Sequence, residues 1–338
     1  MAKWYVKSNA TGNEDGTTEA DAWVNSTQIT GTSTGDQILL YAVSDEVLTT
    51  AFIPPTGAIG ARLDITGVSA TGVNDGTRYV FDGNSASARG IQLSNTTVSI
   101  TFSNIEIKNC TSDGVESSSS SNLGCAFNNC YSHDNGGLGF KATRMTNSEF
   151  VNCIAKDNTG DGFDSREKTL FMGCKAIGNG VYGFDGHSSG SVIHYNCMAI
   201  DNGTDGYQAL QGHVYINCIA DNNTSDGWFV NAVGCHLVEC KATNNGAYGL
   251  NLVSMAFLNG VYIPAGGEDG ANTTAPTTGN FEDYTLAGHK TADLAGTDTD
   301  AGYVNSAADN FIASLSSLFL LRVSTPFACI SLAFSVSI

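Results

Sequence analysis

The sequence predicts an all-β solenoid, a parallel β-helix with about 22 residues in each rung. Three observations support this prediction. One short phrase is repeated six times between residues 130 and 250. No window places apolar residues at sustained helical spacing. The composition, with 39 Gly and only 5 Pro among 338 residues and 41% apolar residues, is typical of a turn-rich β protein.

The repeated phrase is anchored on cysteine. Its copies read NCYSHDNGGLGF, NCIAKDNTGDGF, GCKAIGNGVYGF, NCMAIDNGTDGY, NCIADNNTSDGW and ECKATNNGAYGL. Their steps are 23, 21, 23, 21 and 22 residues, so each copy is expected to form one coil that stacks on the next. The anchors are Cys130, Cys153, Cys174, Cys197, Cys218 and Cys240.

Fixed positions within the phrase predict the shape of one coil. The second residue after each Cys is Ser or Ala, the fifth is always Asn, and the ninth is Gly, followed by an aromatic residue or Leu. Strand alternation predicts that residues two before the Cys, such as Val151 and Met172, share its inward face. We expect the Asn to adopt the left-handed backbone of a sharp corner and to bond to the Asn one rung up.

Ten cysteines raise the question of disulfides or zinc. There is no CxxC motif, and six of the ten recur once per rung. In a stacked solenoid such a column is a run of small, buried, apolar thiols. We therefore expect the cysteines to be structural.

The chain divides into four predicted segments. Residues 1–50 read as an N-terminal cap with the first strands, including 4–6 and 35–43. Residues 51–263 form the parallel β-helix, with strands expected at 63–68, 78–81, 90–93 and 98–107 before the repeats begin. Residues 264–310 are an acidic, Gly/Thr-rich segment. Residues 311–338 are an apolar tail with Arg322 as its one charge, expected to act as a cap or an oligomer interface.

Charge restricts the partners. The net charge is −18, from 33 acids and 15 bases, which disfavours nucleic acid and anionic membranes and offers carboxylates to hard cations such as Ca²⁺. Arg322 and frequent Ser argue against a membrane span in the apolar tail. MAKWYVKSN has no apolar signal-peptide core, as expected of a mature chain or of a virion component. We expect an extracellular or virion-surface protein.

One column of the coil changes chemistry from rung to rung. It is the position directly after the aromatic residue or Leu that follows each Gly. Stacking would place Lys141, Asp164 and Asp185 side by side at this position, ~5 Å apart. Asp161 adds a third carboxylate at the same corner. Carboxylates this close repel unless a cation or Lys lies among them. The whole column reads Lys141, Asp164, Asp185, Gln208, Phe229 and Asn251.

The NCxAxxNxxDGF phrase resembles that of the right-handed parallel β-helix proteins of the pectate-lyase-like superfamily. WYV, NEDGTTEADAW and GDQILLYA resemble their N-terminal cap and first rung, and SNIEIKNCTSDGV, residues 103–115, resembles their first full repeat. The resemblance covers about residues 3–260. It implies a right-handed coil and a polysaccharide partner, in a superfamily of lyases, hydrolases, phage tailspikes and binding-only proteins.

The segment GDGFD, residues 160–164, resembles the calcium-binding DDGxD motif of one β-helix pectate-lyase family. There, carboxylates on neighbouring rungs hold Ca²⁺, which grips a uronate carboxylate while a Lys removes the adjacent proton. The resemblance implies that Asp161, Asp164 and Asp185 hold Ca²⁺ and that Lys141 is the base. The first Asp of the motif is Gly160 here, and the previous rung offers Gly137 and Leu138.

The sequence leaves several functions open. The first is recognition, with or without depolymerisation, of a polysaccharide at the cell exterior or virion surface, as in a phage tailspike-like or decoration protein. The second is a Ca²⁺-dependent polysaccharide lyase. The third is a structural filament or adhesin, with homo-oligomerisation through 311–338. In a purely structural interpretation, Asp161, Asp205 and Asp226 are turn formers and Lys141, Asp164 and Asp185 form a surface ion-pair column.

Overall fold

The computed structural model describes residues 2–252 except 34, 56–61, 94–98, 118–121, 144, 167, 187–190 and 233. It also describes the backbone of 256–259, 262–263, 270–272 and 285–286, and only the backbone at 122–123. The chain divides into two compact units, Met1–Thr297 and Asp298–Ile338, and the second lies outside the described residues. The predictions for 311–338, and for most of 264–310, therefore concern residues outside the described part.

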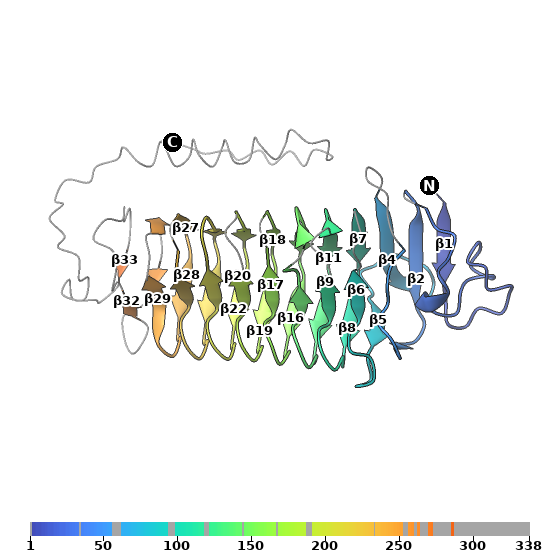
Figure 1. Cartoon of the computed structure of the whole chain (residues 1–338), viewed down its shortest axis with the longest axis horizontal. Coiled ribbons are helices and arrows are strands. Elements are labelled where there is room, and N and C mark those ends of the chain that lie inside the picture. The colour runs from blue at the N-terminus through green and yellow to red at the C-terminus, as the bar shows by residue number, and fades with distance from the viewer. Residues whose placement is uncertain are drawn as a thin grey trace. The chain divides into compact units, whose positions relative to one another are not determined.

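The predicted parallel β-helix is confirmed. The chain passes repeatedly through three sheets, here named A, B and C, and each strand pairs in parallel with its equivalents one rung below and one rung above (Figure 1). Pairing begins with β1 (Lys3–Val6) on β2 (Gln37–Ala42), so the stack already includes strands of the predicted cap. A rung takes about 23 residues; Phe140, for example, lies opposite Phe163.

Sheet A has eleven strands in the part of the chain that is described. They are β1, β2, β4 (Leu63–Ser69), β7 (Ile100–Ser103), β11 (Ala126–Asn128), β15 (Glu149–Val151), β18 (Leu170–Met172), β21 (Ile193–Tyr195), β24 (Val214–Ile216), β27 (Cys235–Val238) and β30 (Ala256–Asn259).

Sheet B follows sheet A in each rung. It contains β3 (Glu46–Val47), β5 (Tyr79–Asp82), β8 (Ile105–Lys108), β12 (Tyr131–His133), β16 (Ile154–Lys156), β19 (Lys175–Ile177), β22 (Met198–Ile200), β25 (Ile219–Asp221), β28 (Lys241–Thr243), β31 (Tyr262–Ile263) and β33 (Thr285–Leu286).

Sheet C completes the rung. It contains β6 (Ile91–Leu93), β9 (Val115–Ser117), β13 (Phe140–Lys141), β17 (Phe163–Ser165), β20 (Phe184–Gly186), β23 (Tyr207–Ala209), β26 (Trp228–Val230), β29 (Tyr248–Leu252) and β32 (Gly270–Asn272). A separate pair joins β10 (Asn122–Leu123) to β14 (Met145–Thr146). Apart from strands and turns, the described residues include a short 3-10 helix at Ser26–Gln28, and no described helix has the length and apolarity to cross a membrane.

At the corner between sheets A and B, the prediction that residues two before each Cys face inward is wrong. Val151 and Met172, two residues before their Cys, point outward and are partly exposed, whereas Phe150 and Phe171 are buried. The reason is the residue just before each Cys, such as Asn152, which has a positive φ of 52°. A left-handed residue turns the chain instead of continuing the pleat, so the alternation restarts at the Cys.

The asparagine column is partly as predicted. The side chains form a buried ladder in which Asn135 Nδ2 donates to Asn158 Oδ1 at 2.9 Å, and the same bond recurs as far as Asn245. The left-handed backbone, however, belongs to the preceding residue, for example Asp134 at φ 53°. The ladder Asn therefore satisfies buried polar groups between rungs, and its neighbour makes the turn.

Two aromatic stacks and the thiol column fill the interior. The anchor cysteines are buried and free, as predicted. Rings of successive rungs stack at centroid distances of 4.7 to 5.1 Å. The stack in sheet A runs Phe102, Phe127, Phe150, Phe171, His194 and Tyr215, and that in sheet C runs Phe140, Phe163, Phe184, Tyr207 and Trp228.

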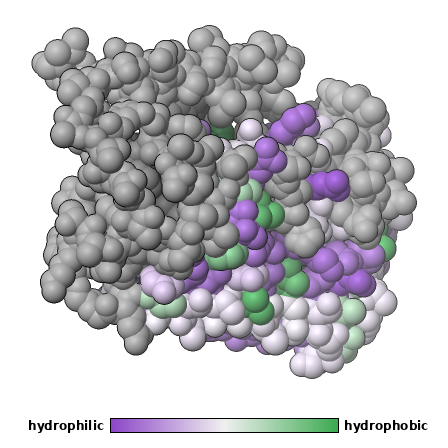
Figure 2. Space-filling model, turned by 60° about the vertical axis from the view of Figure 1, so that its left-hand side comes forward, coloured by the Kyte–Doolittle hydropathy of each residue, from purple (hydrophilic) through white to green (hydrophobic). Residues whose placement is uncertain are grey.

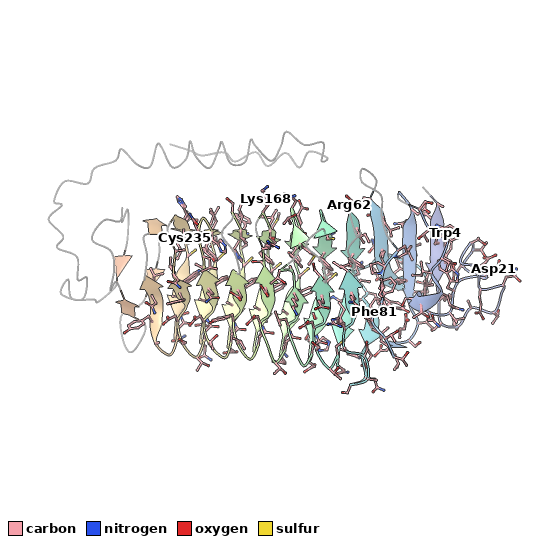
Figure 3. The ribbon with its side chains drawn as sticks, viewed as in Figure 1. Trp4, Asp21, Arg62, Phe81, Lys168 and Cys235 are labelled. Carbon is pink, nitrogen blue, oxygen red and sulfur yellow. The ribbon has the colours of Figure 1, made fainter. Side chains whose placement is uncertain are left out.

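Most predicted strands lie where expected, with one difference. The strand expected at 98–107 is two strands, β7 and β8, because Asn104 adopts φ 53° between them and starts a corner. At the N-terminal end the ring of Trp4 stacks on Trp23 at 5.5 Å, and Figure 3 places Trp4 and Asp21 at the end of the coil opposite Cys235. The coil thus provides a rigid scaffold whose outward columns are free to vary.

Candidate metal centre

The column that begins with Lys141, Asp164 and Asp185 lies on the outward side of sheet C. The register pairs Lys141 with Asp164, Asp164 with Asp185, and Asp185 with Gln208. The column continues through Phe229 to Asn251. Stacking therefore brings together the residues that the sequence placed on successive rungs.

Three carboxylates converge at one corner of this column. Asp161 lies in the turn before β17, Asp164 on β17 and Asp185 on β20, and one oxygen from each lies within 4.8 Å of the others. Asp164 and Asp185 are buried, and Asp161 is partly exposed. Asp164 Oδ1 is buried and has no hydrogen-bond partner among the described residues. The corner therefore concentrates negative charge around an unsatisfied acceptor.

The electrostatics of the corner follow from this crowding. Burial raises the pKa of Asp164 to about 8, and the negative charges of Asp185 and Asp161 add to the effect. Lys141 acts in the opposite sense, but it does not outweigh these effects. At neutral pH Asp164 holds a proton unless a cation takes its place.

Asp161 has a structural partner as well. Its Oδ1 accepts a hydrogen bond from the backbone N–H of Tyr182, one rung further on, at 3.0 Å. The same bond is made by the other acids of this turn column, since Asp113 accepts from Leu138, Asp205 from Asp226, and Asp226 from Tyr248. The turn-forming role in the structural interpretation is therefore real, and it engages the Oδ1 atom of each acid in this column.

Lys141 makes ion pairs with residues that the sequence analysis missed. Its Nζ lies 3.2 Å from Asp113 Oδ2 and 3.3 Å from Glu116 Oε1, and Arg89 also pairs with Glu116. Partial burial opposes the charge on Lys141, but Asp113 and Glu116 outweigh it and raise the pKa of the lysine. The signal was present in the sequence, because the Asp-Gly-Val-Glu segment ending at Glu116 has the spacing of GDGFD.

The Lys141 corner and the Asp161 corner have the same plan. Each joins a turn acid, the strand acid three residues later, and the strand residue one rung further on: Asp113, Glu116 and Lys141 in one, Asp161, Asp164 and Asp185 in the other. In the first, an ammonium lies between two acids. In the second, a third carboxylate takes that place, so either a proton on Asp164 or a cation from solution relieves the repulsion.

A third corner supports this comparison. Asp226 Oδ2 accepts a hydrogen bond from Asn251 Nδ2 at 2.7 Å, and Asn251 occupies the position of Lys141 and Asp185. A donor therefore faces the turn acid in two corners, an ammonium in one and an amide in the other. The donor set of the Asp161 corner, made of carboxylate oxygens alone, fits a hard cation such as Ca²⁺.

Gly160 marks the departure from the DDGxD pattern. A Cβ at this position would lie 3.2 Å from the backbone of Gly137 and 3.3 Å from Leu138 Cδ1. A side chain there requires its neighbours to move by a few tenths of an ångström. The close stacking of the two rungs therefore explains why a residue without a side chain fits well at this position.

The rest of the outward face is mixed in character. Figure 2 shows one side of the molecule, where hydrophilic residues cover much of the described surface and hydrophobic ones are scattered among them. Among the described residues, the large hydrophobic side chains that are well exposed are Val47, Ile53, Val73 and Tyr248. Tyr248 is the first residue of β29, in sheet C, the sheet that also carries Asp164 and Asp185.

The fold and the acidic corner together define a parallel β-helix with a candidate cation site on one sheet. The family model for the right-handed β-helix region matches residues 89–262, which is 174 of 338 residues. The chain belongs to this family, and the right-handed coil implied by the sequence is confirmed.

Solved structures with the same fold include polysaccharide-active proteins. The chain is similar to the pectate lyase Pel9A, with 17% identity, a TM-score of 0.64, and coverage of 90% of this chain and 85% of that one. It is also similar to the A-module of the mannuronan C-5 epimerase AlgE4 from Azotobacter vinelandii, with 15% identity, a TM-score of 0.55, and coverage of 75% and 87%. No curated protein sequence matches the chain. At these identities the likeness is one of fold.

Proposed function

We propose that the chain binds an acidic polysaccharide through a Ca²⁺ held by Asp161, Asp164 and Asp185. The observation that carries the proposal is the convergence of three carboxylates, one oxygen from each lying within 4.8 Å of the others, together with a buried Oδ1 of Asp164 that has no hydrogen-bond partner among the described residues. Ca²⁺ takes six to eight oxygen ligands, so three side chains leave room for the carboxylate of a uronate unit. When bound, the ion would supply a positive charge that grips that carboxylate.

The protein's own residues support this role by being fixed in place. Asp164 and Asp185 lie on paired strands of a rigid sheet, and the Tyr182 N–H orients Asp161. Ligands held by the scaffold lose little freedom on binding, which favours affinity. The two similar solved structures are named for pectate and mannuronan, both polymers of uronic acids, and this agrees with the proposed ligand class.

The overall charge explains why a cation is needed. A protein with net charge −18 repels a polyanion at long range, so direct binding of a polyuronate is unfavourable. A divalent ion held between protein and ligand carboxylates neutralises part of both. The proposal therefore predicts that binding is lost when the ion is removed.

A second candidate is β-elimination by a Ca²⁺-dependent polysaccharide lyase. The register favours it, because Lys141 lies one rung from Asp164 on the same face. As a base, Lys141 would take the proton next to the uronate carboxylate, the electron pair would form the new double bond, the C–O bond to the glycosidic oxygen would break, and that oxygen would take up a proton from water. Asp113 and Glu116 keep the proton on Lys141 at neutral pH, so this activity is expected only under alkaline conditions.

We also propose that the protein works outside the cell or on a virion surface, where acidic polysaccharides are met. A phage tailspike-like or decoration protein fits this location. The alternative of a structural filament or adhesin rests on oligomerisation through residues 311–338, which lie outside the described residues. A filament needs no cation site, so the test below separates it from the polysaccharide-binding functions.

The test is Ca²⁺-dependent binding of polygalacturonate. Titration calorimetry should show binding by the wild-type protein in Ca²⁺, none in a chelator, and weaker binding in Asp164→Asn and Asp185→Asn. Asp205→Asn, a turn acid outside the trio, is the matched control and should bind normally. Unchanged binding in the chelator would overturn the cation-mediated proposal. Ultraviolet absorbance of an unsaturated product at alkaline pH, absent in Lys141→Ala, would establish the lyase.

A further inference from the structure

The outward face of sheet C has two chemically different halves. From β9 to β20 its column carries the charged residues Glu116, Lys141, Asp164 and Asp185. From β23 onward the same column carries Gln208, Phe229 and Asn251, which are neutral. An aromatic ring between two amides is thus in register with the candidate cation site.

The packing of the core does not account for Phe229. Its neighbours on β26, Trp228 and Val230, point inward with no exposed surface and fill the interior. Phe229 points outward and is partly exposed. Part of the Phe229 ring is therefore open to a ligand on the outward side of sheet C.

The position of a second ring strengthens the observation. Tyr248 is 38% exposed and begins β29, the strand in which Asn251 pairs with Phe229 of the preceding rung. Both aromatic residues therefore belong to adjacent rungs of the same part of the coil. Phe229 is two rungs beyond Asp185, a distance of ~10 Å along the sheet.

We propose that Phe229 forms a sugar-stacking subsite for the same polysaccharide, with its chain lying along the axis of the coil from the carboxylate corner toward β29. The inference rests on the proposed function, because the uronate at the corner sets the start of the chain. A pyranose ring presents an apolar C–H face to Phe229, and the amide of Gln208, one rung back, is the hydrogen-bonding group for its hydroxyls, since Asn251 already donates to Asp226.

The straight column argues for a linear polymer as the occupant. The register is unbroken from Lys141 to Asn251, so the charged and neutral halves form one continuous strip. A uronate polymer offers a carboxylate for the acidic half and ring faces for the aromatic half. The subsite is therefore reached only by ligands long enough to extend past Gln208.

The experiment compares short and long oligogalacturonides, in Ca²⁺, on wild type and Phe229→Ala. The variant should bind a long oligomer about tenfold more weakly and should bind a disaccharide as wild type does. Phe229→Trp should keep the affinity for the long oligomer, because the ring is retained. Tyr195→Ala, which removes an outward aromatic residue from sheet A, is the matched control and should change neither.

Two failures can be told apart. If wild type binds the long oligomer and Phe229→Ala binds it equally well, the stacking subsite is wrong while the cation site stands. If wild type binds no oligogalacturonide in Ca²⁺, both proposals fail. Equal weakening of short and long oligomers would also overturn the subsite, because it would place Phe229 at the corner rather than two rungs away. A folded Phe229→Ala variant, checked by its thermal unfolding, is the condition for each comparison.

Discussion

Two corners of the same coil solve the same electrostatic problem in different ways. At one, Lys141 lies between Asp113 and Glu116, at 3.2 and 3.3 Å. At the other, a third carboxylate, that of Asp185, occupies the position of the lysine beside Asp161 and Asp164. The backbone plan is shared, so the difference lies in one residue per rung. A solenoid can therefore convert a structural ion pair into a candidate ligand site without changing its fold.

The largest expected effect comes from making the second corner like the first. Asp185→Lys places an ammonium beside Asp161 and Asp164, so Ca²⁺ affinity should fall about 100-fold or more, equivalent to ~2.7 kcal/mol. Titration calorimetry with Ca²⁺ alone measures this. Asp185→Asn, which imitates the Asp226–Asn251 corner, should show an intermediate loss. Retained affinity in Asp185→Lys would break the comparison.

The reverse change tests the first corner. In Lys141→Ala, Asp113, which is almost fully buried, and Glu116 lose the ammonium that lies between them. The free energy of unfolding should therefore fall by about 2 kcal/mol. Denaturant unfolding at neutral pH measures the loss. The matched control is Lys156→Ala, whose pair with Asp157 is exposed and should contribute almost nothing. Equal effects of the two variants would contradict the role given to Lys141.

The pH dependence of the second corner provides a third test. Asp161, Asp185, Lys141 and Asp113 face Asp164, whose pKa is raised to about 8. Between the unfolded pKa near 4 and this value, the folded state holds a proton that the unfolded state has lost, so stability falls as pH rises. Without cation, the free energy of unfolding should fall by up to about 1.4 kcal/mol for each pH unit between pH 5 and pH 8.

The same linkage predicts proton release. Ca²⁺ binding at pH 7 should release about one proton, and above pH 9 almost none. Calorimetry in buffers of different ionisation enthalpy measures the release, and Asp164→Asn should abolish it and flatten the stability profile. A wild-type stability that is independent of pH in chelator would show that the corner is not electrostatically crowded.

The smallest effect is expected at Gly160. Gly160→Asp adds a fourth carboxylate to the corner and should tighten Ca²⁺ binding a few-fold, by about 1 kcal/mol. The cost is a small loss of stability, because the new Cβ lies 3.2 Å from Gly137. Gly160→Ala separates the two effects, since it has the contact without the charge. Identical Ca²⁺ affinity in wild type and Gly160→Asp would show that this position does not face the ion.

Spacing along the chain was enough to predict the solenoid, the length of its rungs and the members of each column. These follow from spacing, because residues at equal positions in a repeat must stack when the coils do. Asp161, Asp164 and Asp185 could be grouped for this reason alone. The buried thiols and the Asn ladder were predictable in the same way.

What each column faces could not be read from spacing and depends on the folded backbone. The inward direction of Phe150 instead of Val151 depends on the left-handed turn at Asn152, which alternation does not include. The pairing of Lys141 with Asp113 and Glu116 depends on side chains that reach back across a rung, and spacing along the chain does not encode that choice. Repeats fix which residues are neighbours, whereas backbone turns and side-chain rotamers fix which of those neighbours touch.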